Sequence, residues 1–145
     1  MKPFSEIESS LQRDGSLRDF YIHNTTSNDW NQLLQFVTPH LEDDCFLIDS
    51  KPTEMPNDYH QIDEIHKTAS PLLSIPVGGK YLNCHFFCEE IIELDFWPYD
   101  YCDSDSWREL SSFLQQLVNL IQKKGIVTFE NEPETGDPIE TFKPN

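Results

Sequence analysis

Two thiols and an imidazole lie close together in the middle of the chain, in the pattern Cys84-His85-x-x-Cys88. Such groups bind zinc, or act as a nucleophile and its base when a cysteine and a histidine pair. The geometry of an extended strand opposes both uses. Cys84 and Cys88 would be about 13 Å apart along a strand, too far for one zinc ion, and His85 would face the opposite side. We therefore predict reduced, structural cysteines, no metal and no cofactor.

Glu93 and Asp95 form a second pattern, two carboxylates on one side of a strand and about 7 Å apart. Glycosidases use two carboxylates at such separations as acid and base. The same alternation is typical of the solvent-facing side of an ordinary sheet, because Ile92, Leu94 and Phe96 would then point inward. A small carboxylate-dependent hydrolase is therefore the weakest of three candidate functions, and we expect no enzymatic activity.

The segment from 93 to 107 interleaves large aromatic side chains with carboxylates. No Lys or Arg occurs from 81 to 107, whereas seven acidic residues do. Folding gains nothing from a run of like charges, but an acidic surface with exposed Trp and Tyr suits a basic protein partner. Solubility is the alternative reason for these acids. We predict that the partner-binding residues are Glu93, Asp95, Trp97, Tyr99, Asp100, Tyr101, Asp103 and Asp105.

A second run without Lys or Arg extends from 19 to 50 and contains six acidic residues. It is the competing location for the partner-binding surface. Across all 145 residues, 26 Asp and Glu oppose 10 Lys and Arg, which gives a net charge of −16. This charge argues against nucleic acid as a partner, because nucleic-acid binding needs a basic surface. It argues equally against docking on an anionic membrane.

The first six residues lead directly into an acidic segment and lack the apolar stretch of a secretory signal. No stretch in the chain reaches the roughly 20 apolar residues of a membrane span. Together with the unpaired cysteines, these features predict a cytoplasmic protein.

Hydrophobic periodicity predicts the elements that must position these side chains. Apolar residues at helical spacing predict helices over 4–12, from Thr26 to about 41, over 58–65 and over 106–124. Alternating or short apolar runs predict strands over 18–24, 45–48, 72–77, 81–87, 91–97 and 126–129.

Side chains at the ends of these segments favour the same boundaries. Thr26 with Asp29, and Ser106 with Glu109, have the spacing of a capping box at a helix start. Gly125 is expected to end the last helix. Leu114 and Leu117 lie on the apolar stripe of that helix and should be core residues.

The order of these elements predicts an α+β fold with a mostly antiparallel sheet. A three-stranded meander should span about 72–97, and the helix over 106–124 should pack on the sheet. Residues 1–130 should form one globular domain. The acidic, proline-containing segment 131–145 should be an extended or disordered tail on the surface.

The helix start at Asp29-Trp30, the segments 71–75 and 81–87, and the acidic aromatic segment 93–107 resemble the small acidic immunity proteins of bacterial toxin–immunity systems. The resemblance extends loosely over residues 4–130. It implies a cytoplasmic, non-enzymatic inhibitor that binds and neutralises a cognate basic toxin, such as a nuclease. An adaptor or regulatory subunit that binds another protein is the alternative.

Overall fold

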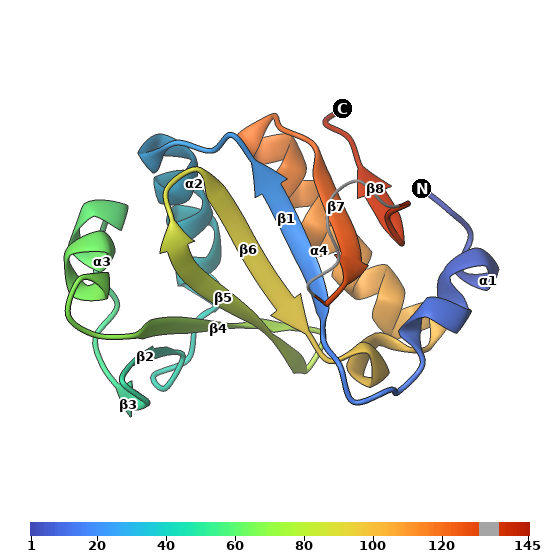
Figure 1. Cartoon of the computed structure of the whole chain (residues 1–145), viewed down its shortest axis with the longest axis horizontal. Coiled ribbons are helices and arrows are strands. Elements are labelled where there is room, and N and C mark those ends of the chain that lie inside the picture. The colour runs from blue at the N-terminus through green and yellow to red at the C-terminus, as the bar shows by residue number, and fades with distance from the viewer. Residues whose placement is uncertain (131–136) are drawn as a thin grey trace.

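The computed structural model describes residues 1–130 and 137–145 (Figure 1). Its α-helices are α1 (Phe4–Ile7), α2 (Ser27–Val37), α3 (Tyr59–His66) and α4 (Ser104–Ile121). Its 3-10 helices are η1 (Glu8–Leu11), η2 (Thr38–His40) and η3 (Pro98–Tyr101). Its strands are β1 (Arg18–His23), β2 (Phe46–Ile48), β3 (Lys51–Pro52), β4 (Pro71–Val77), β5 (Lys80–Cys88), β6 (Ile91–Phe96), β7 (Gly125–Phe129) and β8 (Glu140–Phe142).

The strands of the described residues form one sheet of eight, in the order β3-β2-β4-β5-β6-β1-β7-β8. Every neighbouring pair is antiparallel. The predicted α+β class is therefore confirmed. The first strand of the chain, β1, lies between β6 and β7, so it joins the β4–β5–β6 segment to the C-terminal strands.

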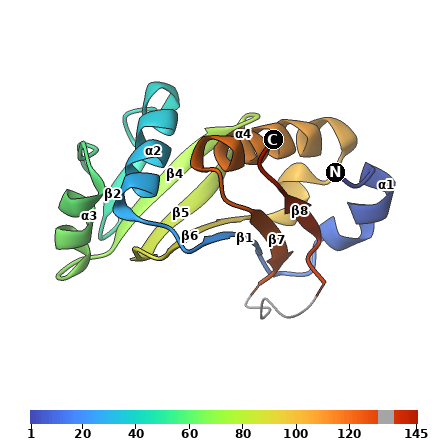
Figure 2. The same cartoon turned by 90° about the horizontal axis from the view of Figure 1, so that it is seen from above.

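In the view from above, α2 and α4 lie on one side of the strands (Figure 2). Within residues 1–130 and 137–145, no helix covers the opposite face. The covered face is apolar because alternate strand residues, such as Phe20, Leu94 and Leu82, point toward the helices and are buried. Leu114 and Leu117 of α4 are also fully buried, as predicted from their spacing.

The aromatic ring of Trp30 holds α2, α3 and the sheet together. Its ring stacks on that of Tyr59 from α3, with 5.0 Å between the ring centroids. It also packs against Phe86 of β5 at 5.3 Å. Its indole Nε1 donates a hydrogen bond of 2.9 Å to the backbone oxygen of Glu89. A buried indole needs such an acceptor, and here the β5–β6 turn supplies it.

The predicted start of α2 is confirmed in atomic detail. The Thr26 side chain accepts a hydrogen bond from the backbone N–H of Asp29, and the Asp29 carboxylate accepts one from the backbone N–H of Thr26. Two otherwise unpaired N–H groups are thereby satisfied.

The predicted limits of the last helix are wrong at both ends. Asp103, rather than Ser106, is the N-cap of α4, because its carboxylate accepts a hydrogen bond from the backbone N–H of Ser106. The helix ends with Gln122 in the left-handed conformation. Gly125 instead begins β7, where a side chain would not fit: an added Cβ would lie 2.5 Å from the Phe20 ring.

Part of the predicted surface tail belongs to the sheet. Glu140–Phe142 form β8, which pairs with β7, and Ile139, Glu140 and Phe142 are buried. The expectation of an extended surface segment is therefore wrong for this part. The Glu140 carboxylate accepts a hydrogen bond of 2.9 Å from the backbone N–H of Lys2, so both chain ends are held at this edge. Residues 131–136 of the predicted tail lie outside the described residues.

No helix in the described part of the chain combines the length and the apolar character needed to cross a membrane.

Candidate functional site: a carboxylate cluster on the uncovered sheet face

The strands β5, β6 and β1 bring six polar side chains together on the face that no helix covers. In the strand register, Glu93 lies between His85 and Tyr21, and Asp95 lies between Asn83 and Asp19. Residues directly opposite each other, and their diagonal neighbours, are close enough to interact. We call this set the open-face cluster: Asp19, Tyr21, Asn83, His85, Glu93 and Asp95.

Asp95 is the most constrained member of the cluster. Only 7% of its surface is exposed. Its Oδ1 accepts a hydrogen bond of 2.7 Å from Asn83 Nδ2, and its Oδ2 lies 2.6 Å from His85 Nε2. A buried carboxylate costs free energy unless such donors surround it. The predicted outward direction of Asp95 is correct, but the side chain is enclosed by neighbouring groups rather than solvated.

Tyr21 lies between two carboxylates. Its hydroxyl donates a hydrogen bond of 2.9 Å to Asp19 Oδ2, and Glu93 is its neighbour across the strands. Burial and these two carboxylates raise the pKa of Tyr21, so its proton is held firmly. Burial raises the pKa of Glu93 as well, and the charge of Asp19 adds to this effect, although the hydrogen bond from Tyr21 acts against it.

His85 is the group whose positive charge, when it is protonated, partly offsets the negative charge of the carboxylates. Burial opposes its protonation, but the hydrogen bond with Asp95 and the charges of Asp95, Glu93 and Asp19 outweigh burial and raise the pKa of His85. Its ring stacks flat on Phe87, with 4.9 Å between centroids. Phe87 itself is 61% exposed. A cavity of about 290 Å³ lies beside this pair and is also lined by Leu72 and His66.

The open-face cluster has an excess of negative charge. The outward positions of β1, β5 and β6, all within the described residues, hold three carboxylates and no Lys or Arg. Asp19 and Asp95 lie directly opposite each other in the register. Like charges in that position destabilise a sheet. Repulsion between these two carboxylates therefore opposes the stabilising contacts that they make with Tyr21, Asn83 and His85.

Two of the predicted binding residues form an exposed aromatic pair at one end of this face. Trp97 and Tyr99 are 40% and 42% exposed, and their ring centroids are 6.0 Å apart. The guanidinium of Arg13 lies 4.8 Å above the Tyr99 ring. Their exposure is what a partner contact requires, and their role as contacts stays a prediction.

The remaining predicted residues are dispersed. Asp100 is half-buried in η3, and Asp103 and Asp105 are exposed at the start of α4. Asp103 is engaged in capping that helix, and its hydrogen bonds with Ser106 lower the pKa of its carboxyl group. Asp105 forms an exposed ion pair of 3.4 Å with Arg108. These acids lie on the segment after β6 and contribute no cross-strand pair to the open-face cluster.

Tyr101 is a core residue, which corrects its assignment as a partner contact. It is fully buried, its ring packs edge-on against Phe96 at 5.6 Å, and its hydroxyl donates a hydrogen bond of 2.9 Å to the backbone oxygen of Val77. Burial raises the pKa of Tyr101. The turn of η3 directs this ring inward while Tyr99 stays outside, a difference that aromatic composition alone does not reveal.

The arrangement suits binding of a cation better than nucleophilic chemistry. Among the described residues, no serine hydroxyl or cysteine thiol is hydrogen-bonded to His85. Cys84 is buried on the helix-covered face, and burial raises the pKa of its thiol. The register of β5 and β6 shifts between His85 and Cys88, which leaves Cys88 half-buried. In residues 1–130 and 137–145, no group of three or more His, Cys, Asp or Glu side chains is placed to hold a metal ion.

Comparisons of the chain with protein-family models, with curated proteins and with solved structures found no match.

Proposed function

We propose that this protein is a non-enzymatic inhibitor, an immunity protein in function, that binds a basic protein toxin through the open-face cluster and the adjacent aromatic pair. The toxin would present Lys or Arg side chains to Glu93, which is half-buried, and the buried carboxylates of Asp19 and Asp95 would add to the negative potential there. Occlusion of a basic active-site cleft, such as that of a nuclease, would then neutralise it.

The observation that carries this proposal is the placement of three neighbouring carboxylates on a sheet face that no helix covers. Asp19 and Asp95 lie opposite each other across the strands, Glu93 lies on the same face, and Tyr21 donates a hydrogen bond to Asp19. A cation beside Glu93 would offset the repulsion among these carboxylates. Arginine and lysine are the side chains with this chemistry.

Exposed aromatic rings lie on both sides of the cluster. Trp97 and Tyr99 lie at one end of β6, and Phe87 lies at the opposite end, on β5. Interfaces concentrate binding energy in such rings, while charges around them accelerate association. The same surface would serve an adaptor or regulatory subunit, which is the alternative form of this proposal.

The test begins with the protein purified from its native host together with whatever remains bound, identified by mass spectrometry. We expect a partner of net positive charge that is toxic when produced alone. Binding kinetics of that partner are then measured against Glu93→Lys, which reverses a charge within the cluster. The association rate should fall by about tenfold, because steering between exposed charges depends on their sign.

The matched control is Glu64→Lys, the same charge change on an exposed residue of α3. It should alter the association rate by less than about twofold, since it lies outside the cluster. Equal effects of the two variants, or a partner that is acidic or harmless, would refute the proposal.

A further inference from the structure

A groove of about 490 Å³ lies on the helix-covered side of the molecule, between α2, α4 and the end of β4. Its apolar lining includes Phe36 and Phe113, whose tilted rings are in contact with 5.4 Å between centroids, and Ile75 and Val77 of β4. Pockets of roughly 300 to 1,000 Å³ accept a compact ligand or a large side chain.

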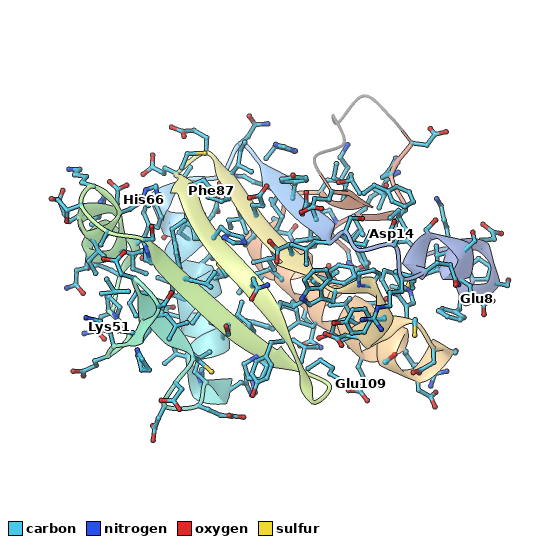
Figure 3. The ribbon with its side chains drawn as sticks, turned by 60° about the horizontal axis from the view of Figure 1, so that its bottom comes forward. Glu8, Asp14, Lys51, His66, Phe87 and Glu109 are labelled. Carbon is cyan, nitrogen blue, oxygen red and sulfur yellow. The ribbon has the colours of Figure 1, made fainter. Side chains whose placement is uncertain are left out.

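The groove stays open because of local features at each end. Pro39 follows the last turn of α2 in η2, so α2 does not continue alongside α4. At the β4–β5 turn, Gly78 adopts a positive φ of 61°, and an added Cβ would lie within 2.4 Å of the Glu109 carboxylate. Figure 3 shows Glu109 beside the tip of this hairpin. A glycine here lets the carboxylate lie at the rim of the groove.

Carboxylates lie beside one end of the groove. His40 lines the groove, and the exposed residues Glu42, Asp43 and Asp44 follow it in the chain. The hydroxyl of Tyr81 donates a hydrogen bond of 3.5 Å to Glu42, which places Glu42 beside the same end of β4, where Tyr81 is opposite Pro76. Glu109 provides a carboxylate from the α4 side.

Positive charge at the groove is limited. Arg108 lines it, but its guanidinium forms an ion pair with Asp105. Lys80 begins β5 just beyond the hairpin turn. The acidic side chains named above exceed these two cations, so the rim complements a basic ligand.

We propose that this groove is a second docking site, separate from the open-face cluster, for a segment of a basic protein that carries one large apolar side chain flanked by Lys or Arg. The apolar side chain enters the groove beside the contacting rings of Phe36 and Phe113, and the flanking cations meet Glu109 and the acidic run 42–44. The run without Lys or Arg from 19 to 50 would then contribute to this second docking site.

The experiment uses two synthetic peptides and the full-length, ¹⁵N-labelled protein. The probe is acetyl-Lys-Arg-Leu-Trp-Lys-Arg-amide, and the control is acetyl-Glu-Glu-Leu-Trp-Glu-Glu-amide. We expect the basic peptide, at millimolar concentration, to shift the amide resonances of Val37, Val77 and Phe113. The acidic peptide should bind at least about tenfold more weakly, because its charges repel the rim.

Three variants sharpen the result. Ser112→Trp adds a ring at the groove and should weaken binding at least about fivefold, whereas Ser112→Ala should leave it unchanged. Ser112 is exposed, so neither change disturbs the core. Arg108→Glu removes a competing cation and should strengthen binding by about twofold or more.

The outcomes separate this proposal from the previous one. Glu93→Lys should bind the basic peptide as the native protein does, since Glu93 lies on the opposite face. The proposal is overturned by an absence of shifts at millimolar peptide, by equal binding of the acidic peptide, or by shifts confined to β1, β5 and β6. The last of these outcomes would leave the open-face proposal standing.

Discussion

The two faces of the sheet are built from the same strands, but one carries apolar side chains and the other carries polar and charged side chains. On the helix-covered face, Phe20, Leu94 and Cys84 are fully buried in neighbouring strands and pack beneath α2 and α4. On the uncovered face, the residues next to them in the sequence are Asp19, Asp95 and His85. The first set removes apolar surface from water, and the second concentrates charge that folding does not require.

In each strand, the side chains that point inward are expected to determine stability, and those that point outward are expected to determine function. Residues that point toward the helices should control the free energy of unfolding. Residues that point away from the helices should affect the free energy of unfolding only weakly, except where they form a hydrogen bond with a buried polar group.

Leu114→Ala should lower the free energy of unfolding by about 2–5 kcal/mol, because it leaves a cavity in a fully buried part of α4. Chemical denaturation followed by circular dichroism measures this change. Ser112→Ala, on an exposed position of the same helix, should cost less than about 0.5 kcal/mol. Similar costs for both variants would mean that the covered face is not the main source of stability.

Asp95→Ala should lower the free energy of unfolding by about 1–3 kcal/mol, although it lies on the uncovered face. The substitution leaves Asn83 and His85 without the carboxylate that both contact at 2.7 and 2.6 Å. Asp105→Ala, which removes an exposed carboxylate at the start of α4, serves as the control and should be nearly neutral. An equally small effect at Asp95 would show that its hydrogen bonds are replaced by water.

The melting temperature should rise as the pH falls from 8 to 6. The pKa of His85 is raised in the folded protein, so protonation of His85 stabilises the fold. This stabilisation is complete below about pH 6.5, the pKa of an unfolded histidine, and it is lost as the pH rises through the pKa of the folded protein. The raised pKa of Glu93 acts in the same direction, because the folded protein favours its protonated form.

His85→Gln should reduce this rise, whereas His66→Gln, on an exposed position of α3, should preserve it. Differential scanning fluorimetry at several pH values gives the comparison. A melting temperature that declines steadily from pH 7 to 5 in the native protein would contradict the expected electrostatics of the uncovered face.

Glu93→Gln should leave the free energy of unfolding unchanged or raise it by a few tenths of a kcal/mol, since it removes one of three neighbouring negative charges. The amide retains a hydrogen-bonding oxygen for Tyr21. Denaturant titration detects the change, and the partner's association rate, measured in parallel, should fall. A loss of more than about 1 kcal/mol would assign Glu93 a structural role in place of a binding one.

Much of the local structure could be predicted from the sequence because it depends on neighbours along the chain. The capping box of Thr26 and Asp29, the two-glycine turn after β4, and the burial of Leu114 follow from spacing and backbone preference. The limits of α4 were mispredicted because Asp103, Ser106 and Gly125 all offer plausible capping chemistry. The packing of Phe20 against Gly125, across the sheet, is a contact that sequence spacing cannot disclose.

Alternation along one strand was enough to predict that Glu93 and Asp95 share a side, with acids and aromatic residues following them. The pairing of β1 with β6 arises only in the folded protein, and it adds Asp19 and Tyr21 to those two carboxylates from a segment more than 70 residues away. It also placed Tyr101 in the core and β8 at the sheet edge. The physical reason is that strand pairing depends on burial shared between distant segments, whereas alternation within one strand is fixed by the backbone itself.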